Sequence, residues 1–225
     1  MGNAIHPTAI IEGAVELGDG NEIGPYSVII GPVRLGDDNL VSPFVTIGTP
    51  GQDTKNPRYD SRDKLISIGD RNIIREHTTI QKPAYENVTQ VGDDVHIMSQ
   101  VHVPHDALIQ DGVVIAPMVA LAGLCRILKG ANIALGSSVH QRTVVGQYSI
   151  VGMGAAAIRH IRPFSKFIPR SPPMVNSYAI KKFGFSEYSE EIEAYVINGL
   201  EPTSPSLRSI VEEFYVMCED RNRNI

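Results

Sequence analysis

The sequence predicts an all-β solenoid, a parallel β-helix built from six-residue units, followed by a small C-terminal α-helical region. Three observations lead to this prediction. Large aliphatic residues recur at every sixth position through most of the chain, a small or β-branched residue accompanies them at a fixed offset, and Gly-Asp turns separate the units. A short, regular repeat is typical of solenoids in which each coil stacks on the next.

The six-residue period is the strongest of these observations. It occupies 22 positions in three runs, and every position is Ile, Leu or Val. Those three residue types make up only about a quarter of the chain, so composition alone does not produce the pattern. The positions are Ile5, Ile11, Leu17, Ile23, Ile29, Leu35, Val41 and Ile47; Ile68, Ile74 and Ile80; and Val91, Ile97, Val103, Ile109, Ile115, Leu121, Ile127, Ile133, Val139, Val145 and Val151.

A second position in each unit carries a small side chain. In the third run, the residue four places after each aliphatic one is small or β-branched throughout, from Val95 to Ala155. Stretches such as LGDGNE and VGDDVH supply Gly and Asp for tight turns. A unit with one large and one small inward side chain describes a short strand and a turn, whereas an amphipathic helix would need a period near 3.6. Such strands must stack, and with three units per coil, stacked residues would lie about 18 positions apart.

Two polar, turn-rich stretches interrupt the repeat, residues 49–67 and residues 81–90. A solenoid accommodates insertions at its corners, so both stretches should project as loops, where binding groups often lie. For the shorter loop we expect no more than a tolerated excursion.

The repeat fades after Ala157, and a proline-rich stretch follows. We therefore divide the chain into a β-helix over residues 1–165 and a C-terminal helical region over residues 166–225. The helices should pack on the exposed end of the solenoid and shield its strand edges. Hydrophobic spacing and end signals predict helices from Met174 to Lys182, ended by Gly184, from Ser186 onward, and from Pro205 to Cys218.

Composition excludes several classes of partner. The chain has 225 residues, a formal net charge of -5 and two cysteines, Cys125 and Cys218. The negative charge argues against nucleic acid or an anionic membrane as the main partner, and two distant cysteines argue against a disulfide framework. The N-terminal MGNAIHPTAIIEG lacks a signal-peptide pattern, and no run of about 18 apolar residues is present. We expect a cytoplasmic protein with no membrane insertion and no nucleic-acid partner.

The stretch VHVPHD, residues 101–106, carries the main candidate site. Because Val103 faces inward, His102 before it and His105 and Asp106 after it should point outward. An imidazole, whose ordinary pKa is about 6.5, can accept a proton at neutral pH. Asp106 could fix the tautomer of that imidazole. The alternative is a solvated surface histidine.

Steps of three repeat units lead from His105 to Gly123 and then to Gln141, so these three residues should form one vertical file, with His140 beside it. The N–H of Gly123 could stabilise a developing oxyanion, because glycine lets a reacting carbonyl approach the main chain. His96 with His102 and His105 resembles a metal cluster at first sight, but their spacing does not match a zinc site, so we expect no metal.

The sequence resembles the UDP-N-acetylglucosamine acyltransferases of lipid A biosynthesis. The similarity covers roughly residues 4 to 186, and the motifs are IHPTAII, EIGPYSVI, GQDTK, IGDRNIIREHTTI, VHVPHD, ALAG, SVHQ and KKFGFS. The resemblance implies a left-handed, three-sided β-helix of hexapeptide repeats that forms a homotrimer with clefts between subunits. It also implies transfer of an acyl group from an acyl carrier protein or coenzyme A thioester, as co-substrate without a further cofactor, to the 3-hydroxyl of a nucleotide sugar.

The resemblance also assigns roles to individual residues. His105 is similar to the general base, Asp106 follows it as in the family, and Gly123 matches the glycine whose N–H faces the thioester oxygen. Trimer formation would let Asp53 reach the His105 of a neighbouring subunit. The residues matched to substrate binding are Asp53, Lys55, His102, His140, Gln141, Asn176 and Lys182.

The chain departs from the family pattern in several places: Leu124 stands where a histidine is usual, and Phe183 where a second arginine is expected. The stretch HVPHD replaces HIAHD, and the C-terminal region is short. The lost basic residue leaves the choice between acyl carrier protein and coenzyme A open. Three alternatives remain beside O-acyl transfer: N-acylation of a UDP- or dTDP-amino sugar, a zinc carbonic anhydrase-like enzyme, and a non-catalytic solenoid.

Overall fold

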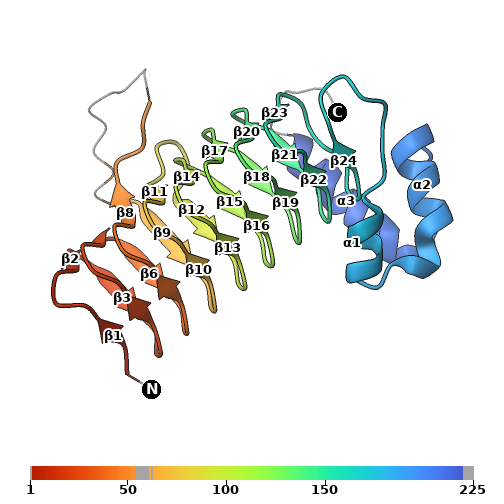
Figure 1. Cartoon of the computed structure of the whole chain (residues 1–225). Helices are drawn as coiled ribbons and strands as arrows, with labels where there is room; N and C mark the ends of the chain where they lie inside the picture. Colours follow the sequence, from red (N-terminus) through yellow and green to blue (C-terminus); the bar gives the residue numbers. More distant parts are fainter. Residues whose placement is uncertain (1, 54–60, 62, 220–225) are drawn as a thin grey trace.

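The chain folds into a three-sided prism of short parallel strands, with a helical unit at its C-terminal end (Figure 1). The computed structural model describes residues 2–53, 61 and 63–219. In these residues the strands form three sheets, here named A, B and C, and successive strands up to β23 enter the three sheets in turn. The predicted fold class, a left-handed parallel β-helix with a small C-terminal helical region, is confirmed.

Each sheet takes one strand from every coil. Sheet A contains β1 (Ala4–Ile5), β4 (Glu22–Ile23), β7 (Leu40–Val41), β10 (Ile73–Ile74), β13 (His96–Ile97), β16 (Val114–Ile115), β19 (Asn132–Ile133), β22 (Ile150–Val151) and β24 (Lys166–Phe167). Sheet B contains β2 (Ile10–Glu12), β5 (Val28–Ile30), β8 (Thr46–Thr49), β11 (Thr79–Gln81), β14 (His102–Val103), β17 (Ala120–Leu121), β20 (Ser138–Val139) and β23 (Ala156–Ala157). Sheet C contains β3 (Val15–Leu17), β6 (Val33–Leu35), β9 (Leu65–Ile68), β12 (Val88–Val91), β15 (Leu108–Ile109), β18 (Arg126–Ile127) and β21 (Val144–Val145).

The register between neighbouring strands follows the predicted spacing. Ile97 lies beside Ile115, so one coil takes three six-residue units. The sequence separation is larger between Val41 and Ile74, and between Ile74 and Ile97, because each of these coils contains one of the interruptions. The two interruptions therefore add residues to a coil without shifting the stack.

The core is a single column of the aliphatic residues that define the repeat. From Ile23 to Val151 each of them is at most 2 % exposed, whereas Ile5, in the first coil, is 44 % exposed because no coil lies beneath it. Complete burial of one such side chain stabilises the fold by about 1.5–3 kcal/mol. Most of the strands contain only two or three residues, so contacts between coils hold the prism together.

The C-terminal region contains α1 (Ser177–Lys182), the 3₁₀-helix η1 (Ser186–Tyr188), α2 (Ser189–Asn198) and α3 (Pro205–Glu219). The first helix begins later than expected from the sequence, because Val175 bridges Ser165 and Asn176 caps α1. It ends at Lys182, and Gly184 has a φ of 78°, as expected of the residue that stops a helix. None of the helices in the described ranges has the length and apolar character needed to cross a bilayer.

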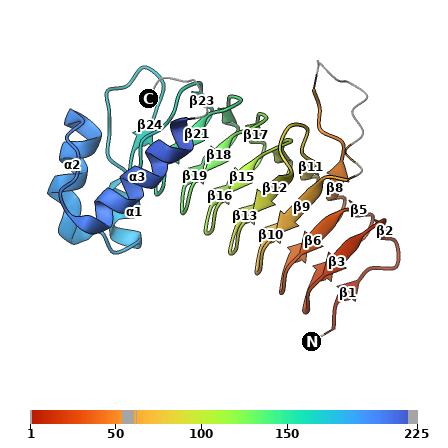
Figure 2. The same cartoon turned by 180° about the vertical axis from the view of Figure 1, so that it is seen from behind.

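The helices cover more than the end of the prism. Phe214 of α3 packs against Val144 of β21 and against Leu128, which follows β18, so α3 lies along the side of the solenoid formed by sheet C (Figure 2). Tyr148 and Phe164 of the last coils join the core between α1, α2 and α3. The expectation that the helices only shield the open end was therefore incomplete.

Both interruptions leave the prism at the corner between sheets B and C. The first lies between Thr49 of β8 and Leu65 of β9, and the second between Gln81 of β11 and Val88 of β12. Both are shorter than the predicted stretches, because residues at each end join strands. The next coil turns this same corner at residues 104–107, so both loops leave the prism directly beside His105.

Candidate active site

The predicted file of His105, Gly123 and Gln141 exists at this corner. Leu124 N donates to the carbonyl oxygen of His105 at 3.1 Å, and Arg142 N donates to that of Gly123 at 3.0 Å, which stacks the three turns in register. His105 and Gly123 are buried, whereas Gln141 and its neighbour His140 are exposed. The spacing of one coil therefore places the predicted groups on one edge of the prism.

His105 and Asp106 form a buried hydrogen-bonded pair. The Nδ1 atom of His105 lies 2.7 Å from Oδ2 of Asp106. The carboxylate also accepts hydrogen bonds from the backbone N–H groups of Ala84 and Tyr85, at 3.1 Å, and of Glu86, at 2.7 Å. The Asp106 side chain points out of the prism as expected, but it is fully buried and does not reach solvent. The shorter loop covers it, so this loop is part of the site and not merely a tolerated excursion.

A buried arginine fixes the shorter loop to the prism. Nη2 of Arg126 lies 2.5 Å from Oε1 of Glu86, and Nη1 lies 2.6 Å from the carbonyl oxygen of Asp106. Arg126 is 5 % exposed, and a buried charge needs such partners. We call residues 82–87 the site loop, and the Arg126–Glu86 pair its latch.

The imidazole of His105 is enclosed on several sides. A β-carbon on Gly123 would overlap Cε1 and Nε2 of the ring, and one on Gly51 would lie 2.7 Å from Cβ of His105. The ring of Tyr85 lies 5.8 Å from the imidazole, centroid to centroid. Among the described residues, no polar group bonds to Nε2, and the His105 side chain keeps 11 % of its surface exposed. Nε2 is therefore the nitrogen available to a substrate.

His102 lies on the outer face of sheet B, close to His105. Its Nδ1 atom lies 2.8 Å from Oγ1 of Thr79 in the coil below. Burial, and next the charge of His105, lower the pKa of His102 from its ordinary value of 6.5. At neutral pH this imidazole is uncharged, and it offers substrate a hydrogen bond without positive charge.

This lowered pKa predicts a titration that can be measured. In an NMR pH titration, the ring C–H signal of His102 should move with a midpoint below 6.5. Since the unfolded chain then binds more protons, the stability contributed by neutral His102 is complete above about pH 6.5 and falls as the pH drops below it. His102→Gln should remove that part of the pH dependence. A midpoint at or above 6.5 would contradict the prediction.

Asp53, from the first loop, also belongs to this corner. The Tyr85 hydroxyl donates to Oδ2 of Asp53, so Tyr85 connects Asp53 to the His105 of the same chain. Within one chain, Tyr85 thus lies between Asp53 and His105, and the expectation that Asp53 reaches a neighbouring subunit's His105 stays a prediction. Lys55, predicted to bind substrate from the same loop, lies outside the described residues.

The repeats of this chain are similar to repeats in known proteins. Residues 14–49 and 89–123 match the family model described as "Bacterial transferase hexapeptide (six repeats)". Over these two segments the chain is similar to bacterial transferase hexapeptide repeats.

Curated relatives and solved structures also match this chain. The acyl-(acyl-carrier-protein)–UDP-N-acetylglucosamine O-acyltransferase of Gloeothece citriformis is 37% identical over 147 residues, which cover 64% of this chain and 52% of the relative. The protein of the same name from Herminiimonas arsenicoxydans is 34% identical over 154 residues, 67% of this chain and 57% of the relative. The chain thus spans about half the length of these curated relatives.

The structural neighbours include the UDP-N-acetylglucosamine acyltransferase of Bacteroides fragilis. It has a TM-score of 0.71 and 26% identity, and the match covers 99% of this chain and 97% of that one. The structure from Acinetobacter baumannii, with a TM-score of 0.70 and 23% identity, covers the same shares and shows the same fold. The resemblance drawn from the sequence motifs is confirmed.

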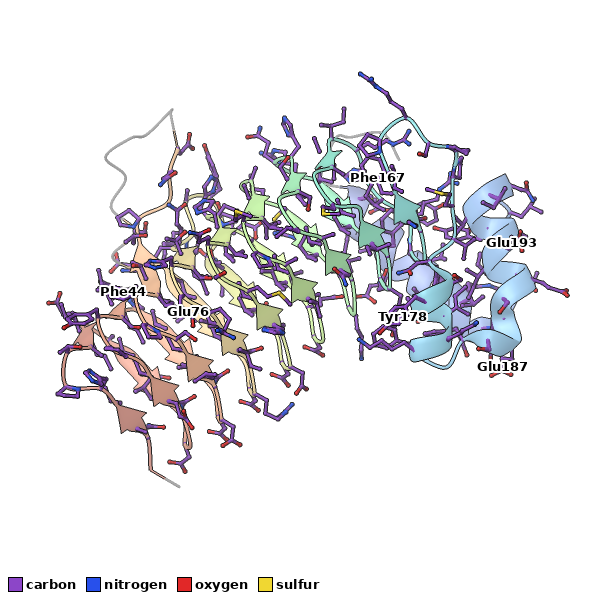
Figure 3. All side chains as sticks on the ribbon, viewed as in Figure 1. Phe44, Glu76, Phe167, Tyr178, Glu187 and Glu193 are labelled. Atoms are coloured by element: carbon purple, nitrogen blue, oxygen red, sulfur yellow. The ribbon has the colours of Figure 1, made fainter. Side chains whose placement is uncertain are left out.

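Two residues predicted to bind substrate lie away from the corner that carries His105. Asn176 and Lys182 line a pocket of about 480 Å³ between sheet A and α1. Tyr178, which lines the same pocket, lies at the helical end of the molecule (Figure 3). Sheet A is the face opposite the corner between sheets B and C. Within one chain, therefore, Asn176 and Lys182 do not meet His105. The Asn176 side chain also donates to the carbonyl oxygen of Tyr148 at 2.9 Å.

Leu124 and Phe183, which depart from the family pattern, are both packed against neighbouring parts of the molecule. Leu124 occupies a left-handed turn position, with a φ of 63°, and is 6 % exposed at the same corner as Asp106. Phe183 packs its ring 4.8 Å from that of Tyr148, and Nζ of Lys182 lies 4.9 Å from its centroid. An aromatic residue at 183 thus anchors α1 to the prism where a basic side chain was expected.

The histidines do not converge as ligands. His96 belongs to β13 of sheet A and His102 to β14 of sheet B, so they lie on different faces of the prism. In the described part of the chain, no three His, Cys, Asp or Glu side chains form a group that could hold a metal ion.

Sequence reasoning missed Tyr85, Glu86 and Arg126. Arg126 left no usable signal, because its file down sheet C also contains the polar residues Arg34, Ser67 and Gln90, besides Leu108 and Val144. The sequence did not mark the site loop either, because its contacts do not follow the repeat.

Proposed function

We propose that this protein is an acyltransferase that moves an acyl group from a thioester to the 3-hydroxyl of UDP-N-acetylglucosamine or a related nucleotide sugar. The observation that carries the proposal is the buried His105–Asp106 pair, whose imidazole lies directly against Gly123. The curated relatives are named acyl-(acyl-carrier-protein)–UDP-N-acetylglucosamine O-acyltransferases, which supports this reaction class.

His105 is suited to act as the general base. With Asp106 bound at Nδ1, the proton of a neutral ring belongs on that nitrogen, and Nε2 keeps a lone pair beside Gly123. Nε2 takes the proton of the sugar hydroxyl while its oxygen attacks the thioester carbonyl. Asp106 orients the ring and stabilises the imidazolium, in the role that a carboxylate plays in other histidine-based acyl transfers.

Gly123 is suited to stabilise the tetrahedral intermediate. Among the described residues, none accepts a hydrogen bond from its N–H. That N–H can therefore donate to the oxyanion that forms when the carbonyl is attacked. As the intermediate collapses, the C–S bond breaks, and the proton held by Nε2 passes to the departing thiolate. The acyl ester and the free thiol are the products. No further cofactor takes part in this scheme.

We also propose that the working form is a homotrimer in the cytoplasm. Asn176 and Lys182 lie on the face opposite His105, so one substrate can contact all three residues only where two chains meet. Asp53, His102, His140 and Gln141 of one chain would then hold the sugar, together with Asn176 and Lys182 from the next. This arrangement agrees with the resemblance and explains why the single chain leaves its substrate-binding residues apart.

A direct assay tests the proposed reaction. The protein is incubated with UDP-N-acetylglucosamine or its 3-amino analogue, and with acyl-carrier-protein or coenzyme A thioesters of several lengths. We expect release of free thiol and an ester at the 3-position. Transfer to the amine alone would assign N-acylation instead. A blank across the whole panel would overturn the proposal, and zinc-dependent hydration of carbon dioxide would assign a carbonic anhydrase.

A further inference from the structure

Tyr85 touches two of the residues assigned to the site. Its hydroxyl donates to the Asp53 carboxylate, and its ring lies 5.8 Å from the imidazole of His105 at an interplanar angle of 56°. The side chain is nevertheless 54 % exposed. It therefore presents a partly exposed aromatic ring beside the imidazole of His105.

The backbone of Tyr85 is held firmly although its side chain is exposed. Its own N–H donates to the buried Asp106 carboxylate at 3.1 Å, between the donors from Ala84 and Glu86. Glu86 is fixed in turn by the latch to Arg126, at 2.5 Å. A charge-assisted pair buried at one end is much stronger than an exposed one. The site loop thus holds the backbone of Tyr85 in one position beside His105.

An exposed tyrosine beside a carboxylate matches the chemistry of a sugar ring. A carboxylate accepts hydrogen bonds from sugar hydroxyls, while an aromatic face packs against the apolar side of the ring. The Tyr85 hydroxyl donates to one carboxylate oxygen of Asp53 and so fixes the orientation of that carboxylate. If Tyr85 served only to pack against His105, its ring alone would suffice.

We propose that Tyr85 is a substrate-positioning residue: with Asp53 it forms the subsite for the sugar ring of the acceptor, and the Arg126–Glu86 latch holds it there. This inference rests on the proposed transfer to a nucleotide sugar and specifies which part of the cleft receives the sugar. It adds three residues to the site that the sequence motifs did not indicate.

Tyr85→Phe and Tyr85→Leu test the proposal. Tyr85→Phe keeps the ring and removes the donor to Asp53, so we expect KM for the nucleotide sugar to rise roughly 10-fold or more with little change in kcat, since hydrogen bonds to charged groups have about this effect. Tyr85→Leu also removes the aromatic face and should raise KM further. KM for the acyl thioester should stay the same in both variants. Tyr26→Phe, an exposed tyrosine on another corner of the prism, is the matched control.

The latch is tested separately by hydrogen exchange. Glu86→Gln and Arg126→Met should speed exchange of the Tyr85 and Glu86 amides and raise KM for the sugar, while Tyr85→Phe leaves those amides protected. Unchanged KM in Tyr85→Phe, or an equal rise for both substrates, would overturn the proposal. If the wild type shows no turnover, the proposed function fails, and calorimetric binding of UDP-N-acetylglucosamine then decides: weaker binding by Tyr85→Phe supports the subsite, whereas equal binding or none overturns it.

Discussion

Replacing His105 with alanine should lower kcat for acyl transfer by roughly 10²–10⁴-fold, the usual effect of losing a general base. Nε2 is the nitrogen left open to substrate, while Nδ1 is committed to Asp106 at 2.7 Å. Without the imidazole, the sugar hydroxyl must transfer its proton to water. KM for both substrates should change much less than kcat, because Asp53, Tyr85 and His102 remain in place. Steady-state kinetics with each substrate varied in turn measures this.

Two comparisons make the result for His105 specific. His6→Ala removes an exposed histidine far from the corner and should leave kcat unchanged. Asp106→Asn keeps the shape of the side chain but replaces one acceptor oxygen with an amide donor. It should therefore lose part of the rate, because the tautomer of His105 is no longer fixed. If His105→Ala kept wild-type kcat in a folded protein, a histidine general base would be excluded.

The solenoid could be predicted from the sequence because its stabilising contacts are periodic. Each inward aliphatic residue packs against its counterpart in the next coil, as Ile97 does with Ile115. The buried positions therefore recur at a regular spacing in the sequence. The file of His105 and Gly123 followed from the same spacing. The corner of the prism was thus predictable to the level of single residues, including the exposed position of Gln141.

The rest of the site depends on contacts that the period does not encode. Ala84 and Glu86 reach forward along the chain to Asp106, and Glu86 reaches still further to Arg126, because a loop folds over the corner. A polar loop has many conformations of similar energy, and the buried acceptors of Asp106 together with the latch to Arg126 select this one. Burial of Asp106 could not be foreseen while the site loop was treated as a simple excursion.

The position of Asn176 and Lys182 illustrates a different limit. Motif matching assigned them to the same substrate as His105, yet a rigid prism places them on the opposite face. The two observations agree only if neighbouring chains complete each other's clefts. Sequence resemblance predicts that these residues act together, and the fold shows that one chain does not bring them together, so their joint action stays a prediction.

Gly123→Ala should lower kcat about 10²-fold or more and also destabilise the protein. The new methyl group would occupy the space of Cε1 and Nε2 of His105, so the imidazole must leave its position. A displacement of about 1 Å at a reacting group can cost that much in rate, and overpacking of a buried site costs about 1–3 kcal/mol in the free energy of unfolding. Because the backbone N–H at position 123 remains in the variant, the loss in kcat measures the displacement of the His105 imidazole and not the loss of an oxyanion donor.

A double-mutant cycle identifies the cause of this effect. In the His105→Ala background the ring is absent, so adding Gly123→Ala should reduce neither the residual rate nor the stability appreciably. Thermal or urea unfolding of the four proteins measures the coupling, and kinetics measures it independently. If Gly123→Ala were equally harmful with and without the imidazole, the strain would lie in the backbone of the turn. Strong coupling would show that glycine is required at 123 because the ring of the base occupies the place of a side chain.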